Sequence, residues 1–439
     1  MNGLKIGVAF IMTFFLMGGA WAQDQPTRDK RKLFGYDVEG LKPVKLIMIS
    51  DAPFGSVGDV LALTFERVVE EESKGKIQLD HHRFGSLYTG RDLPKVIPLG
   101  TVDLGSINKG YLMTKAPAYV PWVVAYIWKS PEHMLALTGG PEWYGMEETL
   151  SGKHWGIKPL SHIAYGNWDY WSNREIRTIN DFGGKRFWSY GELSNAYIIS
   201  WGGTPVIQSR AEMTMSYYKK AIDGISASST VYFDLKLYEG GKYWLNMPTY
   251  PPGSTGFHYV QLYMNREKWN TLPEAYKKIL IDAADLYSWN SIWEILCLEK
   301  ASEYQLVHDH GMIDVGIATK TPGEYQRICD TAVEAGRKYG KEKRGVSDEE
   351  WNKAEAIKNK YGDPKLSADY TWWYKLAWAE ADRRVEDAKK RIKSGEAPAK
   401  AWEYTHPKRF YEMPYEKVKE EWMRTPRCIR NWPMELRLK

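Results

Sequence analysis

The stretch from residue 185 to residue 227 decides the fold, and it reads KRFWSYGELSNAYIISWGGTPVIQSRAEMTMSYYKKAIDGISA. Short apolar runs alternate here with longer helical patterns, and glycines separate the elements. The predicted order is strand, helix, strand, helix and strand, at Lys185–Ser189, Glu192–Trp201, Thr204–Gln208, Ala211–Lys220 and the residues after Ala221–Gly224. Strands joined by crossover helices run parallel, so the stretch predicts a parallel α/β sheet that binds ligands at its strand ends.

The amino-terminal part of the chain repeats this order of elements. Strands and helices alternate at Val44–Ile49, Asp59–Ser73, Lys76–His82, Arg91–Leu99 and Thr101–Ile107. The first strand is a continuous apolar run, which is typical of a buried strand. The sequence therefore predicts a second βαβαβ unit.

Three segments around the central stretch carry a resemblance to a known family. They are Asn173 to Asp181 followed by Gly184-Lys185, Trp201 to Val206, and Glu212 to Gly224. In this order and spacing they resemble the substrate-binding proteins of TRAP (tripartite ATP-independent periplasmic) transporters, the C4-dicarboxylate-binding family. The resemblance runs from about Val44 to Glu342. It implies an α/β, two-lobed periplasmic binding protein fold with a ligand cleft between the lobes, and no cofactor, metal or enzyme activity.

The residues and the resemblance together predict a domain organisation, and the resemblance implies the partners. The expected segments are a signal peptide (1–22), a lead-in (23–43), lobe 1 (44–125 with a return strand near 259–265), lobe 2 (126–258), the long helix and C-terminal helices of the binding fold (266–344) and a helical extension (345–439). Lobe 2 is expected to hold strands at His154–Ile157 and Ile163–Tyr165 and a helix at Leu235–Lys242. The long helix is expected from Leu272 to about His310. The expected partners are a small organic solute and the membrane permease subunits of a transporter.

The extension from residue 345 lies beyond the resemblance. Ser347 with acidic residues after it predicts a helix start. A second helix at Leu366–Lys393 is expected to place Trp372, Leu376, Ala379 and Arg383 on one face, and a third spans Pro414 to Met423. The extension is expected either to pack on lobe 2 or to form a docking or oligomer surface, such as a homodimer interface.

The first residues have the pattern of a targeting segment. Lys5 precedes an apolar run from Ile6 to Ala20, which has the length of a signal-peptide core. Ala20-Trp21-Ala22 predicts cleavage before Gln23, and the alternative is a membrane anchor. We therefore expect export to the periplasm.

Composition excludes some functions. The net charge is only +5, and lysines alternate with glutamates, so the chain has no basic stripe of the kind that binds nucleic acid. The three cysteines are widely spaced and do not have the spacing of a metal site. With 20 tryptophans and 29 tyrosines, the chain holds many rings that suit cores, pockets and interfaces.

The expected ligand site departs from the family pattern. The family grips a substrate carboxylate with an arginine on the strand after Gly184, and the matching position here is Trp188. The position of a second arginine, common in members that bind acid sugars, is Trp168. The position of a family asparagine is Ala227. Arg186 lies two residues before Trp188 and points to the same side of the strand.

Three ligand classes remain open at this site. Tryptophans favour an aromatic or apolar solute by stacking, or a cation by cation–π contact with Asp51 as counter-charge. Arg210 instead favours an anion held from a new direction. The other candidates for contact with the ligand are Asn108, Tyr190 and Tyr232, whereas Glu212 is expected to begin a helix.

Two other function classes are alternatives to solute binding. An enzyme would need a cluster of reactive side chains, but His81 and His82 alternate across a strand, and His308 and His310 are badly spaced for joint metal binding. A ligand-binding sensor or scaffold would use the same fold and recruit a partner through the extension. The sequence favours a solute-binding protein.

Overall fold

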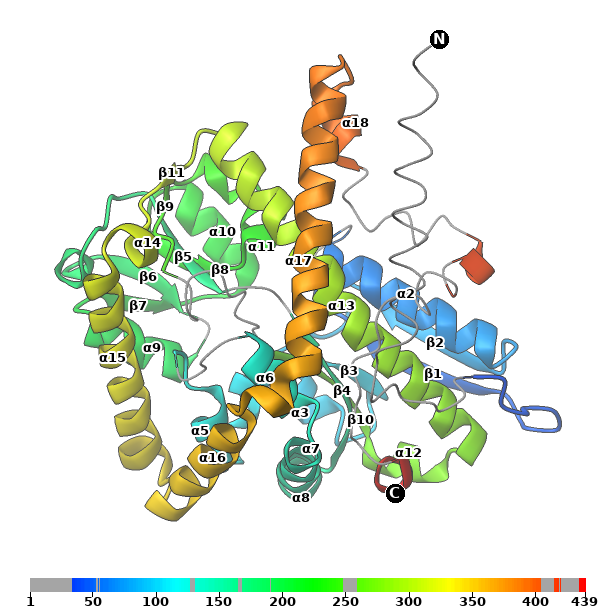
Figure 1. The fold of residues 1–439 in the computed structure, drawn as a ribbon. Helices are drawn as coiled ribbons and strands as arrows, with labels where there is room; N and C mark the ends of the chain where they lie inside the picture. Colours follow the sequence, from blue (N-terminus) through cyan, green and yellow to red (C-terminus); the bar gives the residue numbers. More distant parts are fainter. Residues whose placement is uncertain are drawn as a thin grey trace, which may run out of the picture.

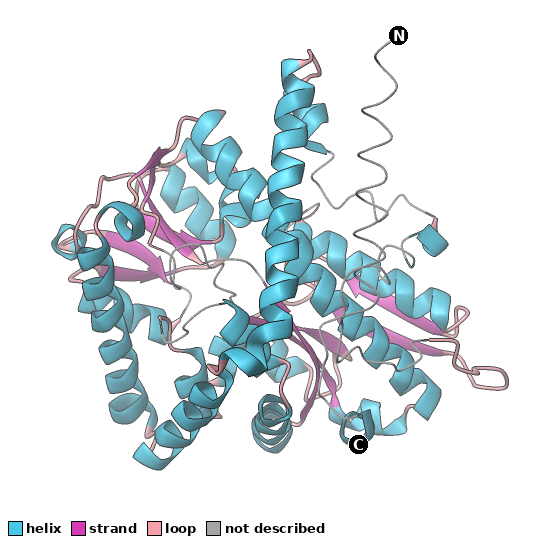
Figure 2. Ribbon diagram, in the orientation of Figure 1, coloured by secondary structure: helices cyan, strands magenta, loops and turns pink. Residues whose placement is uncertain are grey.

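The computed structural model describes residues 34–52, 54, 56–126, 131–164, 168–189, 191–247, 259–403, 414–417, 419 and 434–439. Two separate sheets lie on opposite sides of the molecule, and helices cover both of them (Figure 2). The architecture is therefore the predicted two-lobed α/β fold.

The first sheet has five strands in the order β2-β1-β3-β10-β4. Their bounds are Val44–Ile49 (β1), Ile77–His82 (β2), Leu104–Asn108 (β3), Ile157–Ala164 (β4) and Tyr259–Asn265 (β10). β1 pairs in parallel with β2 and β3, and β10 runs antiparallel to β3 and β4. The predicted βαβαβ unit and the predicted return strand are confirmed.

The predicted placement of two strands in lobe 2 is wrong. In place of strands at His154–Ile157 and Ile163–Tyr165, the structure has the single strand β4, which pairs with β10 in the first sheet. His154 belongs to a short helix, α8 (Lys153–Trp155). Pro159 and the polar residues after it interrupt the apolar pattern, so only pairing with the distant β10 defines this strand. The register shifts at Leu262/Tyr263, where Leu160 of β4 is bulged out of the pairing.

The second sheet has six strands in the order β11-β9-β5-β8-β6-β7. Their bounds are Asp169–Ser172 (β5), Arg186–Ser189 (β6), Thr204–Ile207 (β7), Gly224–Ala227 (β8), Tyr243–Trp244 (β9) and Ile313–Asp314 (β11). β6 pairs in parallel with β7 and β8, as the central stretch predicts. The connecting helices are α9 (Glu192–Ser200) and α10 (Arg210–Tyr218).

The helix predicted at Leu235–Lys242 forms earlier in the chain. α11 spans Ser229–Asp234, because the Ser228 side chain accepts a hydrogen bond from the Val231 backbone and caps its start. Lys236, at φ 52°, then adopts a left-handed conformation that ends the helix. Only a 3₁₀ turn, Leu237–Glu239, remains of the predicted segment.

The long helix α13 (Glu274–His308) spans both lobes and has nearly the predicted bounds. It packs against α2 (Val57–Glu72) and β4 of the first lobe and against α11 of the second. The smaller helices around the two sheets are α3 (Leu93–Val96), α4 (Lys109–Leu112), α5 (Val120–Val123), α6 (Pro131–Thr138), α7 (Pro141–Glu147), α12 (Arg266–Thr271), α14 (Ile317–Lys320) and α15 (Pro322–Lys338).

The extension begins with α16 (Asp348–Tyr361) and continues through α17 (Pro364–Lys393), α18 (Pro398–Glu403) and α21 (Met434–Leu438). α17 packs along α13 and α6, and in Figure 1 it runs as the long orange helix between the two lobes. The extension is therefore built on the lobe-spanning helix rather than on lobe 2 alone. The part of the predicted third helix between Pro414 and Met423 lies largely outside the described residues.

The buried face of α17 differs from the predicted one. Ala379 and Arg383 are exposed, and the side chain of Trp372 lies outside the described residues. The positions that face inward recur every three or four residues, at Tyr374, Ala377, Ala381, Arg384 and Ala388. No described helix combines the length and the apolar character that crossing a membrane requires.

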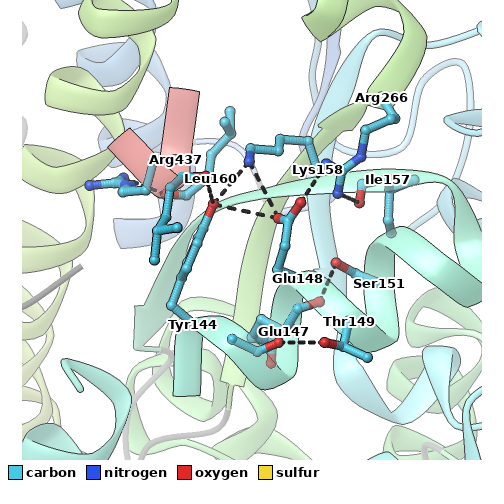
Figure 3. Close-up of polar contacts among 12 residues, drawn as sticks. Tyr144, Glu147, Glu148, Thr149, Ser151, Ile157, Lys158, Leu160, Arg266 and Arg437 are labelled. Carbon is cyan, nitrogen blue, oxygen red and sulfur yellow. Dashed lines mark hydrogen bonds and ion pairs between the residues drawn. The ribbon is translucent and has the colours of Figure 1, made fainter. Parts of the chain in front are cut away.

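A network of buried charges lies beside β4 of the first sheet (Figure 3). Lys158 is fully buried, and its Nζ donates to the Tyr144 hydroxyl at 2.9 Å and to Glu148 Oε2 at 3.3 Å. Arg266 pairs with the same Glu148 carboxylate. Burial lowers the pKa of Lys158 to about 8, although Glu148 opposes the shift.

Candidate functional site

The carboxyl ends of β1, β2 and β3 meet at one edge of the first sheet, because the three strands are parallel. Asp51 follows β1 there, and its carboxylate lies against Gly90, where an added Cβ would be 2.5 Å from Oδ2. Arg91 comes next in the chain. Asn108 ends β3, and its side chain accepts a 2.8 Å hydrogen bond from the Gly110 backbone, which caps α4. This edge thus brings Asp51 close to Arg91.

The second lobe meets this edge at the loop between β7 and α10. The Gln208 carbonyl accepts a 3.0 Å hydrogen bond from Trp188 Nε1 and a 3.5 Å contact from Arg91 Nη2. Arg91 belongs to the first lobe and Trp188 to the second, so this oxygen joins the lobes. We call Asp51, Arg91, Trp188, Gln208 and Arg210 the interlobe site.

Arg210 is the first residue of α10 and lies directly after the capping residue. Ser209 and Glu212 form a capping box, which confirms the expected helix-start role of Glu212 in the first turn of α10. Hydrogen bonds from Ser209 hold the pKa of Glu212 below its usual value, and the charge of Arg91 adds to this. Nη1 of Arg210 is buried and has no hydrogen-bond partner among the described residues. This guanidinium donor belongs to the residue two positions after Gln208, and a buried donor without a protein partner indicates a ligand or water.

Three predicted site positions fall in one hydrophobic cluster of the second lobe. Trp168, Trp188 and Ala227 pack there, and each tryptophan is only 6% exposed. Tyr232 lies in the same cluster, stacked on Trp171 with ring centroids 4.1 Å apart. These side chains pack mainly against one another, so they offer little ring surface for stacking a ligand. Tyr190 lies outside the described residues.

Arg186 does not join the interlobe site. Its guanidinium is half exposed and lies 3.5 Å from Asp223 Oδ2, while its backbone donates to the same carboxylate. Asp223 therefore holds it at the outer end of β6.

Gln261 is a candidate that the sequence reasoning missed. It lies on β10, fully buried, and neither its amide oxygen nor its amide nitrogen has a hydrogen-bond partner among the described residues. It pairs with Ile107, two residues beyond the Gly105 that pairs with Ile49 of β1. Gln261 therefore lies beside the carboxyl end of β3, at the sheet edge where Asp51 follows β1. A buried amide without a protein partner indicates a polar ligand or water.

Asp169 is a second missed candidate, at the start of β5. Its carboxylate accepts hydrogen bonds from Trp244 Nε1 at 2.7 Å, the Tyr170 backbone at 2.7 Å and the Met247 backbone at 2.9 Å. Burial nevertheless raises the pKa of Asp169 to about 7. The buried hydroxyl of Tyr126 lies within electrostatic range of this carboxyl.

The raised pKa of Asp169 predicts a pH-dependent stability. Below about pH 4 the carboxyl is protonated in both states. Between about pH 4 and 7 the folded protein keeps the proton that the unfolded chain releases, so the stabilisation falls as pH rises and is lost above about 7. Each pKa unit corresponds to about 1.4 kcal/mol. Urea unfolding of Asp169→Asn at pH 4.5, 6.0 and 7.5 should show a flatter profile than the unchanged protein.

A matched control for this prediction is Glu349→Gln, which removes one charge from the exposed surface of α16. This variant should follow the pH profile of the unchanged protein. Parallel profiles for all three proteins would contradict the raised pKa of Asp169.

Arg91 is a further candidate that the sequence reasoning missed, and both Arg91 and Gln261 have a signal in the sequence. Arg91 begins the predicted helix that follows a predicted parallel strand, and ligand contacts gather in such connections. Gln261 is a lone amide in the apolar strand YVQLYMN. Neither signal tells whether a side chain finds a protein partner, because that depends on distant segments.

A family model described as bacterial extracellular solute-binding protein, family 7 (DctP), matches residues 56–334. Among curated proteins, the chain is 23% identical over 163 residues to the uncharacterized protein YiiZ of Salmonella typhimurium. That alignment covers 36% of this chain and 48% of the relative, so the chain spans about half the length of the curated relative that it matches.

Solved structures share the fold. A TRAP periplasmic solute-binding protein of Shewanella oneidensis with bound succinate superposes with a TM-score of 0.64 at 16% identity, over 72% of this chain and 99% of that one. A homologous protein of Desulfovibrio salexigens with bound orotic acid gives the same four values. An extracytoplasmic solute receptor of Bordetella pertussis that binds pyroglutamic acid gives a TM-score of 0.62 at 14% identity, over 72% and 99%.

The family model covers well over half of the chain, and the two lobes have the architecture of the solved structures. The protein belongs to the bacterial extracellular solute-binding protein family 7.

Proposed function

We propose that this protein is the extracytoplasmic solute-binding component of a TRAP-type transporter. It captures a small organic anion between its lobes and delivers it to membrane permease subunits. The observation that carries this proposal is the Gln208 carbonyl, which joins Arg91 of the first lobe to Trp188 of the second. A solute bound there would contact both lobes. Its binding would therefore stabilise the closed arrangement of the two lobes.

An anionic solute fits the interlobe site best. Arg91 lies beside the loop that begins α10, and Arg210 is the first residue of that helix, with a buried Nη1 lacking a protein partner. A guanidinium binds a carboxylate through two parallel hydrogen bonds. Gln261 adds an amide that can orient a second polar group of the solute. The buried tryptophans, in contrast, favour neither an aromatic solute nor a quaternary amine.

Bound solutes in the structural neighbours agree with this choice. The Shewanella protein holds succinate, the Desulfovibrio protein holds orotic acid, and the Bordetella receptor binds pyroglutamic acid. Each of these compounds carries a carboxylate. The family's carboxylate-binding arginine corresponds to Trp188 in this chain. The guanidinium of Arg210 would take over its role from a different position.

We further infer that residues 1–22 act as a signal peptide, cleaved before Gln23, that delivers the chain to the periplasm. The apolar run Ile6–Ala20 and the Ala20-Trp21-Ala22 pattern support this inference. These residues lie outside the part that the structure describes.

Binding experiments test the solute class directly. The protein from Gln23 onward would be titrated by calorimetry with dicarboxylates, sugar acids, aromatic acids, neutral aromatics and quaternary amines. We expect binding among the carboxylates, and Arg210→Gln should weaken it about 10- to 100-fold, because a charge-assisted hydrogen bond contributes about 1.5–3 kcal/mol. Arg91→Gln should weaken it in the same direction.

Arg186→Gln is the matched control, since Arg186 is half exposed and pairs with Asp223. It should leave the affinity unchanged. Binding confined to neutral aromatics or quaternary amines would overturn the proposal of an anionic solute, as would an unchanged affinity in both Arg210→Gln and Arg91→Gln.

A further inference from the structure

A second cavity lies away from the interlobe site, between α15 and α16. Its volume is about 590 Å³, within the range of small-molecule sites in proteins. His133 of α6 and Tyr126, which follows α5, also line it. α16 lies beyond residues 56–334, where the family model matches, so the extension of this chain builds one wall.

The two helical walls of the cavity carry opposite charges. On α15, Asp330 and Glu334 lie one turn apart and share a face. On α16, Lys358 faces the cavity beside Asn359. Arg337 and Glu355, one from each wall, pair with each other, and Glu355 also accepts a 3.0 Å hydrogen bond from Trp351 Nε1. The charges that stay available are therefore two carboxylates on one wall and one ammonium on the other.

Lys358 is the decisive group, because it is 5% exposed. Its Nζ donates to the Pro121 carbonyl at 3.0 Å and forms no ion pair with any residue that the structure describes. An ammonium has three donors, and burying it without an anion is costly. Burial lowers the pKa of Lys358 to about 8, although the charge of Glu355, which is itself paired with Arg337, opposes the shift. The Lys358 backbone is fixed as well, since its carbonyl accepts a 2.6 Å hydrogen bond from His133 Nε2.

The cation of the acidic wall, Arg337, is taken up by Glu355 of the opposite wall. Asp330 accepts a 2.8 Å hydrogen bond from the neutral amide of Gln326. Within the described part of the chain, neither Asp330 nor Glu334 forms an ion pair. Both carboxylates are exposed on the rim, where an incoming ammonium group can reach them.

We propose that this cavity is a second binding site and that it takes a small zwitterion of the amino-acid class. The carboxylate of the ligand pairs with Lys358, and its ammonium group pairs with Asp330 and Glu334. A simple anion would meet the two rim carboxylates, and a simple cation would meet Lys358, so a molecule with both charges fits best. This site is additional to the interlobe site and does not depend on which solute binds there.

The test is calorimetry on the protein from Gln23 onward. The ligands are the proteinogenic L-amino acids, each compared with its deaminated acid and its decarboxylated amine. We expect at least one amino acid to bind, and both truncated analogues to bind at least tenfold more weakly. Glu334→Gln, an exposed substitution that leaves the fold intact, should weaken binding at least threefold. Lys358→Met should abolish binding.

Variants distinguish this site from the interlobe site. Arg210→Gln should leave amino-acid binding at the cavity unchanged, even if it abolishes solute binding between the lobes. The proposal is overturned if no amino acid binds, or if a deaminated acid or an amine binds as well as its parent. It is equally overturned if Arg210→Gln removes the amino-acid binding while Glu334→Gln does not weaken it.

Discussion

Replacing Glu147 with leucine is expected to destabilise the protein by about 3–5 kcal/mol. Glu147 is fully buried at the end of α7 and pairs with Lys109, which is 1% exposed. It also accepts hydrogen bonds from the hydroxyls of Tyr119 at 3.1 Å and Tyr263 at 2.9 Å. Without Glu147, the buried ammonium of Lys109 loses the carboxylate that it pairs with, and the cost of that buried charge causes most of the loss.

A double variant separates this charge effect from packing. Lys109→Met combined with Glu147→Leu removes both charges, so it should cost less than Glu147→Leu alone. Urea unfolding followed by tryptophan fluorescence gives the free energy of unfolding for each protein. If the double variant lost the sum of the two single losses, the pair would not be the source of the effect.

Arg437→Ala is expected to cause a loss of similar size, about 3–5 kcal/mol. Arg437 is 1% exposed in α21, and its Nη atoms lie 2.8 and 2.9 Å from the two carboxylate oxygens of Asp285 in α13. Nη2 also donates to the Leu160 carbonyl at 2.8 Å (Figure 3). The alanine variant leaves Asp285 buried and charged, and it leaves that carbonyl without its donor.

Glu435→Ala is the matched control, because Glu435 lies in the same short helix and is exposed. It should change the free energy of unfolding by less than about 0.5 kcal/mol. Asp285→Ala should be as harmful as Arg437→Ala, and the two losses should not add. If Arg437→Ala unfolded at the same urea concentration as Glu435→Ala, the expected contribution of the Arg437–Asp285 pair to stability would be wrong.

Local patterns were enough to predict most elements of this fold. β1 and β10 have the predicted bounds, because each is a continuous strand-forming run between turn residues. α13 also has nearly its predicted bounds, because Leu272-Pro273-Glu274 starts a long segment without helix-breaking residues. The parallel order of β6, β7 and β8 follows from crossover helices that are visible in the sequence.

Long-range pairing explains what the sequence did not reveal. β4 joins the first sheet through β10, which is about 100 positions away. The predicted buried face of α17 is based on apolar residues such as Trp372 and Leu376. The structure instead buries Arg384, whose guanidinium pairs with Glu294 of α13 at 2.7 Å. Charged residues are usually exposed, so the sequence alone predicts that both members of a buried ion pair lie on the surface.

In the candidate site, too, some features follow from the local sequence and others depend on long-range packing. The positions of Asp51 and Arg210 follow from their places after a strand and before a helix. The contact of Arg91 with Gln208 depends on how two lobes meet, 117 positions apart in sequence. The burial of Trp168 and Trp188 in one cluster is likewise a property of the packed lobe.

The bulge at Leu160 bears on how this protein avoids self-association. β4 is an outer strand of the first sheet, and an outer strand with free backbone groups can recruit a strand from another chain. Here Arg437 donates a hydrogen bond to the Leu160 carbonyl, and Arg266 donates one to the Ile157 carbonyl at 3.2 Å. Two carbonyls of this outer strand are thus already bonded to guanidinium groups, and a strand that paired with them would have to displace both charges. Loss of Arg437 would therefore promote aggregation through β4 in addition to lowering stability.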